Sequence, residues 1–167
     1  MTSSPWGVEL VCLGNICRSP MAHVVLESRL QDAGIDDVVV TSSGTGGWHE
    51  GESMDPRAAA ALGAAGYDPT RHRARTFSLD TYAETDLMLA MDHSNLADMV
   101  EQAPTVAAAG RAVLFRSFDP ESGEGDDEVP DPWYGGDEGF QHVLAMVERT
   151  VDVLLERLPD LRDRYAR

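Results

Sequence analysis

The sequence contains few cysteines, and this limits what they can do. There are only two, Cys12 and Cys17, which are too few to complete a zinc site by themselves. The N-terminal residues MTSSPWGVEL lack both the positively charged start and the long apolar core of a secretory signal, so a structural disulfide has no obvious use either. Reactivity therefore becomes the more interesting role for this pair.

Positive charge and long apolar runs are scarce as well. The 13 Lys plus Arg residues are outnumbered by 29 Asp plus Glu, and the formal net charge is -16. Such a charge repels polyanions at long range, so we expect neither nucleic acid nor an anionic membrane among the partners. No apolar run approaches the roughly 20 residues of a membrane span. These absences predict a soluble, cytoplasmic protein.

No repeat and no linker divides the 167 residues, and this length suits one hydrophobic core, so one domain over residues 1–167 is expected. Short β-branched or apolar runs predict four strands, at Val8–Leu13, Val38–Ser42, Asp86–Met91 and Arg111–Phe115. Helix signals alternate with these strands. The alternation is typical of an α/β three-layer sandwich, in which a four-stranded parallel sheet carries helices on both faces.

Two helices have clear start signals in the first half of the chain. Ser19 and Pro20 begin a helix after the first strand, and Gly34 is placed to end it. Asp55 is the expected N-cap of another helix, with Pro56 at its first position.

The second half of the chain combines helices with one long acidic segment. A short helix opens at Ser94, and apolar residues spaced three or four apart from Phe140 to Leu158 predict a final helix packed on the sheet. Between the last strand and this helix lies an acidic segment, from Arg116 to Gly139. Its length indicates that it is either disordered or functional.

The stretch from Cys12 to Pro20 joins the first strand to the first helix, at the edge where open parallel sheets bind ligands. The residues between Cys12 and Arg18 are enough for backbone N–H groups to curl around an anion in front of the helix dipole. Arg18 adds a planar fork for two phosphate oxygens. The same positive field stabilises a thiolate, which favours Cys12 as a nucleophile. A phosphate-binding loop is therefore predicted after the first strand.

The run CLGNICRSP from Cys12 to Pro20, with DPWYGG at Asp131–Gly136, closely resembles the low-molecular-weight protein tyrosine phosphatases. The segments SSGTGGWHEG, HRAR and AMDHSNL are similar to further landmarks of that family, in the same order. A Cys-x5-Arg pattern alone recurs by chance, whereas the ordered set is specific. The resemblance implies an enzyme of α/β fold that hydrolyses phosphotyrosine and small aryl phosphates through a phosphocysteine intermediate, with no metal or other cofactor.

The resemblance also implies roles for individual residues. Cys12 resembles the nucleophile, Arg18 the phosphate-binding group, and Asp131 the general acid that later serves as a base. Ser19 resembles the serine that hydrogen-bonds the thiolate, and Asn15 the asparagine that holds the loop in a strained shape. The other expected residues of the phosphate-binding loop are Leu13, Gly14, Ile16 and Cys17.

Three further expectations concern residues around this loop. Ser42 and His72 resemble partners that support Asn15. Two roles remain open for Cys17. It is either a packed side chain or, as the resemblance suggests, a redox partner that traps Cys12 as a reversible disulfide.

Apart from the resemblance, the residue types also predict a general acid and a pocket with aromatic walls. A departing phenolate needs a proton, and the acidic segment that contains Asp131 is where an acid could reach in. Trp48, Trp133 and Tyr134 are the aromatic residues expected to wall the pocket and sandwich a phenyl ring. Trp133 departs from the resemblance, since many family members have tyrosine there.

Two other functions fit the sequence less well. Arsenate reduction uses the same fold, but its relay needs further cysteines, and none follows Cys17. A non-catalytic phosphotyrosine-binding module would not need Cys12, Arg18 and Asp131 together. The expected partners are tyrosine-phosphorylated proteins, and the expected oligomeric state is a monomer or a weak dimer.

Overall fold

A four-stranded parallel sheet forms the middle of the computed structural model, which describes residues 4–167. The strand order is β2-β1-β3-β4, so the first strand lies inside the sheet between the second and third. Leu10 pairs with Ser42 on one side and with Leu89 on the other. The predicted parallel sheet is confirmed, with bounds β1 (Trp6–Cys12), β2 (Val38–Gly44), β3 (Leu87–Ala90) and β4 (Ala112–Leu114).

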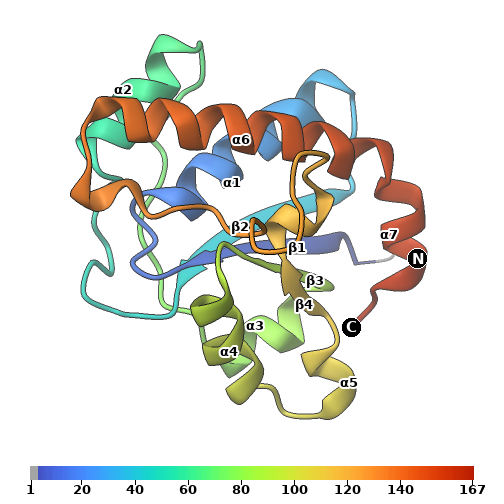
Figure 1. Ribbon diagram of the computed structural model, residues 1–167. Coiled ribbons are helices and arrows are strands. Elements are labelled where there is room, and N and C mark those ends of the chain that lie inside the picture. The colour runs from blue at the N-terminus through green and yellow to red at the C-terminus, as the bar shows by residue number, and fades with distance from the viewer. Residues whose placement is uncertain (1–3) are drawn as a thin grey trace.

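Helices cover both faces of the sheet (Figure 1). The face with the longer helices carries α1 (Arg18–Asp32), α2 (Pro56–Ala64) and α6 (Asp137–Glu156), followed by α7 (Leu158–Arg164). The opposite face carries α3 (Leu79–Glu84), α4 (His93–Glu101) and α5 (Val106–Ala109). In residues 4–167 we find no helix with the length and apolar character needed to cross a membrane.

Local signals locate the longer helices well. Asp55 caps α2 as predicted, because its side chain accepts a hydrogen bond from the Arg57 N–H. The helix expected to open at Ser94 begins one residue earlier, with Asp92 as its N-cap. The helices α3 and α5 were not predicted, since elements of 6 and 4 residues carry too little periodicity to recognise.

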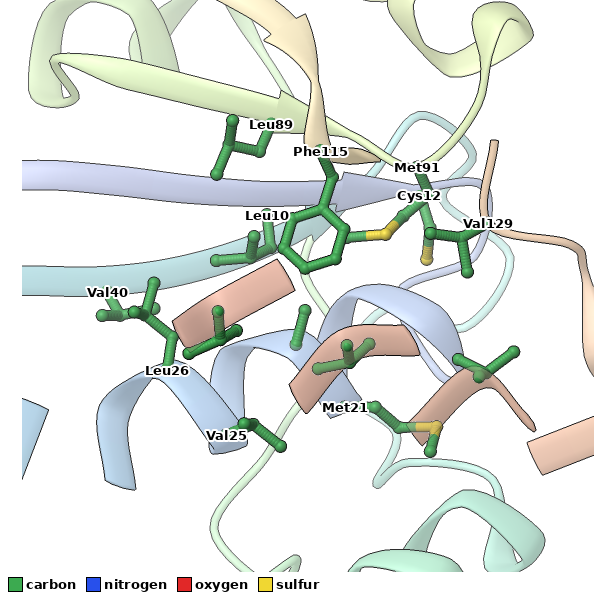
Figure 2. Packing of buried hydrophobic residues seen from close by; sticks show 14 of the residues in the cluster. Leu10, Cys12, Met21, Val25, Leu26, Val40, Leu89, Met91, Phe115 and Val129 are labelled. Carbon is green, nitrogen blue, oxygen red and sulfur yellow. The ribbon is translucent and has the colours of Figure 1, made fainter. Parts of the chain in front are cut away.

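The larger hydrophobic core lies between the sheet and the α1 and α6 helices. Alternate residues of β1, including Val8 and Leu10, point into it, whereas Val11 faces the smaller core on the other side. Cys12 is the last β1 residue of the larger core, and it lies at one end of that core beside Met91 and Val129 (Figure 2). Burial of the strand thus fixes where the Cys12 sulfur is presented.

The long acidic segment is ordered by buried ion pairs. Arg116 is only 1% exposed; its Nε donates to Asp119 at 2.8 Å and its Nη1 to the Glu128 carbonyl at 2.9 Å. Arg149 of α6 also donates to Asp119, at 2.8 and 3.0 Å. Two short 3-10 helices, η1 (Phe115–Phe118) and η2 (Pro132–Tyr134), complete the segment. The segment is therefore ordered, and the expectation that it could be disordered is wrong.

Gly44 ends β2 directly against the loop that follows β1. A Cβ atom at Gly44 would lie 2.6 Å from the Leu13 carbonyl oxygen and 2.9 Å from the Asn15 nitrogen. Both contacts are with backbone, which cannot rotate away. Only glycine therefore lets the loop and the strand end pack together.

We predict that Gly44→Ala lowers the free energy of unfolding by about 1–3 kcal/mol, because the loop must shift to admit the methyl group. Gly63→Ala is the matched control: Gly63 lies within α2 and a Cβ there meets nothing within 4 Å. Alanine should be neutral or stabilising at Gly63, by up to about 1 kcal/mol. Urea-induced unfolding measures both. Equal unfolding free energies for the two variants would contradict the packing described above.

Candidate active site

The loop between Cys12 and Arg18 turns its carbonyl groups outward. Four carbonyl oxygens accept hydrogen bonds from the surrounding protein: Cys12 from Thr45 N (2.9 Å), Leu13 from Gly46 N (2.8 Å), Asn15 from His72 Nε2 (2.7 Å) and Ile16 from Asp55 N (2.9 Å). The Cys17 carbonyl accepts from Met21 N (3.3 Å) in the first turn of α1 (Arg18–Asp32). Carbonyls held outward leave the N–H groups of the loop facing its centre. The first turn of α1 adds the positive end of a helix dipole. The loop is thus shaped to surround an oxyanion.

Asn15 makes the sharp turn in this loop. Its φ of 57° is the one positive value at a non-glycine position in residues 4–167, and Asn tolerates this left-handed region better than most residues. The buried amide holds the turn from both ends: Nδ2 donates to Ser19 Oγ at 2.8 Å, and Oδ1 accepts from Arg75 N at 2.9 Å.

The Cys12 sulfur has two hydrogen-bond donors. The Asn15 N–H donates to Sγ at 3.3 Å. Ser19 Oγ lies 3.0 Å from Sγ and already accepts from Asn15, so its own proton is available for the sulfur; the Ser43 carbonyl, at 3.4 Å, is the longer alternative. Donors of this kind stabilise a thiolate more than a thiol. The geometry suits a nucleophilic sulfur at the base of an anion site.

Arg18 is nearly buried, at 3% exposed, and is aimed by acceptors from two distant segments. Its Nη1 donates to Asp92 Oδ2 at 2.7 Å and to the Val129 carbonyl at 3.1 Å, and its Nη2 lies 3.8 Å from Asp131 Oδ2. Burial by itself lowers the pKa of Arg18, but the charges of Cys12, Asp92 and Asp131 raise that pKa above its ordinary value. The guanidinium therefore stays charged beside the loop.

Asp92 does two things with its two oxygens. Oδ1 accepts from Asn95 N at 2.7 Å and caps α4, while Oδ2 holds Arg18. One carboxylate therefore joins the start of α4 to the arginine beside the loop.

A cleft of about 220 Å³ opens above the loop. The structure brings together in its lining Cys12, Leu13, Gly14, Ile16, Cys17, Arg18, Trp48, His49, Asp131, Trp133 and Tyr134. The exposed fractions of Trp48 and Tyr134 are 72% and 92%, so both stand at the mouth, whereas Trp133 is less exposed at 41%. An aromatic ring entering the cleft would pass between these side chains.

His49 is the lining residue that sequence reasoning left out. Its ring lies 6.1 Å from that of Trp133, and its Nδ1 is 2.6 Å from Glu52 Oε2. The available signal was its place beside Trp48 in a glycine-rich loop, because such loops next to a site commonly carry function.

Cys17 is held as a thiol. Burial, together with the negative charges of Asp55, Cys12 and Asp131, raises its pKa to about 12. Both cysteines are free rather than joined. Within residues 4–167, the His, Cys, Asp and Glu side chains form no group of three or more placed to bind a metal ion.

The expectation that Ser42 supports Asn15 is wrong, while His72 does contact Asn15. Ser42 pairs with Leu10, two residues before Cys12, so its hydroxyl reaches α1 and lies 2.9 Å from Nδ1 of His23.

His72 Nε2 donates to the Asn15 carbonyl. Burial, opposed by this hydrogen bond, lowers the pKa of His72 to about 4. The imidazole is therefore neutral in the folded protein.

The lowered pKa of His72 predicts that the folded protein becomes less stable in acid. The unfolded imidazole takes up a proton near pH 6.5, whereas the folded one does so only near pH 4. Stability should thus be complete above pH 6.5 and fall, by on the order of 3 kcal/mol, as the pH drops toward 4. Urea unfolding across this range should show His72→Gln losing that slope, and the exposed His142→Gln retaining it. An unchanged slope in His72→Gln would contradict the assignment.

Comparisons with known proteins agree on one family. A family model described as low molecular weight phosphotyrosine protein phosphatase matches residues 7–163. The low molecular weight protein-tyrosine-phosphatase of Streptomyces coelicolor is 47% identical over 149 residues, which cover 89% of this chain and 90% of that protein. Low molecular weight protein-tyrosine phosphatase A of Mycobacterium tuberculosis is 44% identical over 162 residues, covering 96% and 92%.

Solved structures extend the likeness to three dimensions. A crystal structure of a protein tyrosine phosphatase from Entamoeba histolytica, described with Hepes in its active site, superposes with a TM-score of 0.87 at 28% identity, over 94% of this chain and 99% of that one. The low molecular weight phosphotyrosine phosphatase of Vibrio cholerae gives a TM-score of 0.85 at 30% identity, over 93% and 97%. Together with the family match over most of its length, these relatives show that the chain belongs to the low molecular weight protein tyrosine phosphatases.

Proposed function

We propose that this phosphatase hydrolyses phosphotyrosine in proteins, and small aryl phosphates, in two steps through a phosphocysteine on Cys12. One observation carries the proposal: the Cys12 sulfur lies under a loop whose carbonyls are held outward, with the Arg18 guanidinium beside it. The inward N–H groups and Arg18 supply positive charge where phosphoryl oxygens would lie. Charge stabilisation and nucleophile thus meet in one cleft.

In the first step the Cys12 thiolate attacks the phosphorus atom. An S–P bond forms while the bond from phosphorus to the tyrosyl oxygen breaks. Asp131 lines the same cleft and lies within 3.8 Å of Arg18, so it can reach the departing oxygen and give it a proton. Tyrosine leaves neutral, and the phosphoryl group stays on sulfur.

In the second step a water molecule attacks the phosphocysteine. Asp131, now a carboxylate, takes a proton from that water, and the S–P bond breaks to release inorganic phosphate. The Ser19 hydroxyl and the Asn15 N–H stabilise the thiolate that departs. The enzyme returns to its starting state with the same donors in place.

The mouth of the cleft favours an aryl phosphate over an alkyl one. Trp48, Trp133 and Tyr134 offer flat apolar surfaces on which a phenyl ring can pack, which a phosphoserine side chain lacks. Arsenate reduction is not favoured, because no cysteine follows Cys17 to continue a relay. A purely binding module would have no use for an acid at Asp131.

We predict that Cys12→Ser lowers turnover of p-nitrophenyl phosphate by at least about 10³-fold, because the hydroxyl is a far weaker nucleophile at neutral pH. Binding of inorganic phosphate should stay within about tenfold, since the loop amides and Arg18 remain. Steady-state kinetics with a chelator present and calorimetric phosphate titration give the two values. Full activity in Cys12→Ser, or activity that needs added metal, would exclude the mechanism.

Asp131→Asn tests the acid. Phenyl phosphate has a poor leaving group, so its first step should slow by about 10²-fold or more. The first step with p-nitrophenyl phosphate should slow much less, because p-nitrophenolate can leave without protonation. Stopped-flow measurement of phenol release isolates this step. Equal slowing of both substrates would show that Asp131 does not protonate the leaving group.

A further inference from the structure

Arg57, at the start of α2, binds the segment that contains Asp131. Its Nη1 donates to the carbonyl oxygens of Trp133 and Gly135, both at 3.1 Å. The guanidinium also lies 5.5 Å from the Trp133 ring centroid and 4.7 Å from that of Phe140. The hydrogen bonds and the cation–π contacts together fix the position and the orientation of the planar guanidinium.

Asp55 orients Arg57. Asp55 Oδ1 accepts from Arg57 N at 2.8 Å and from Nε at 3.1 Å, while Oδ2 accepts from Nη2 at 3.0 Å. Burial by itself raises the pKa of Asp55, but its hydrogen bonds to Arg57 lower that pKa below the ordinary value. The carboxylate is thus charged, and it leaves Nη1 of the fork turned toward η2.

The Asp131 segment has few other anchors. Before Asp131, the Val129 carbonyl is held by Arg18. After it, Pro132 is buried but Trp133 and Tyr134 are exposed. One oxygen of Asp131 lies 3.8 Å from Arg18 Nη2, and the other accepts from Trp133 N at 3.0 Å, so the direction of the carboxyl group depends in part on the position of η2. Arg57 binds the carbonyl of that same Trp133.

We propose that Arg57 is a positioning residue for proton transfer: by holding the Trp133 and Gly135 carbonyls it fixes η2, and through the Trp133 N–H it fixes the carboxyl group of Asp131. Arg57 acts through Asp131 and does not touch the substrate. The inference rests on the proposed role of Asp131 as the acid. A lysine cannot fully replace Arg57, because it lacks the fork in which Nη1 binds the two carbonyls while Nε and Nη2 bind Asp55.

The test compares Arg57→Gln and Arg57→Lys on two substrates of different leaving-group ability. With phenyl phosphate, kcat for Arg57→Gln should fall by about 10- to 100-fold, because a displacement of about 1 Å at a proton donor costs that much. With p-nitrophenyl phosphate the fall should stay below about threefold, and inorganic phosphate should bind as before, since the loop and Arg18 are unaltered. With phenyl phosphate, kcat for Arg57→Lys should lie between the values for wild type and Arg57→Gln.

Arg29→Gln is the matched control. Arg29 also makes side-chain hydrogen bonds between elements, to Asp152 and Tyr67, but it lies outside the cleft. Arg29→Gln should change kcat for the two substrates by the same factor, if at all. Asp55→Asn provides a second route should Arg57→Gln fold poorly, because Asn still caps α2 but pairs more weakly with Arg57; the same substrate dependence is expected, at smaller size.

A double variant separates positioning from general damage. If Arg57 works through Asp131, adding Arg57→Gln to Asp131→Asn should cost nothing further with phenyl phosphate. Additive losses, equal losses on the two substrates, or full recovery with Arg57→Lys would each overturn the inference. If Asp131→Asn itself shows no leaving-group dependence, the proposed acid fails and this inference fails with it. A dependence in Asp131→Asn that Arg57→Gln does not share overturns the inference alone.

Discussion

The backbone turn at Asn15 is the constraint on which the site depends. Amides can face the centre of the loop only if the chain passes through the left-handed region, and Asn15 does so at φ 57°. His72, Arg75 and Ser19 hold that residue, and Gly44 leaves room for it. In this way a chain with a net charge of -16 builds an anion site from dipoles and one arginine.

The parts of this arrangement that the sequence predicted are those with local signals. The run from Cys12 to Pro20 lies between a short apolar strand and a helix start, and neither inference needs a distant residue. The order of the acidic segment could not be predicted in the same way. It depends on Arg116 and on Arg149 of a later helix, both bound to Asp119. No periodicity along the chain reveals such a pairing.

Partners of the loop were harder still to predict. Ser42 was wrongly expected beside Asn15, because strand register decides which residue of β2 reaches the loop, and that residue is Gly44. Arg57 gave no functional signal, since an arginine in the first turn of a helix is usually a solvated residue. Its aim is set by Asp55 and by two carbonyls far along the chain. The directions of these side chains could therefore not be predicted from the sequence.

The supports of the loop are spread along the chain, and this bears on folding and synthesis. Thr45, Asp55 and His72 hold the loop carbonyls, and the Val129 carbonyl holds Arg18. Contacts between residues so far apart in sequence carry a loop-closure cost, and they exist only once the chain has brought these segments together. A nascent or partly unfolded chain thus carries an ordinary cysteine at position 12, without its cradle of amides. The loop around this sulfur exists only in the completed protein, so the activity that we propose for it would also report how much of a preparation is fully folded.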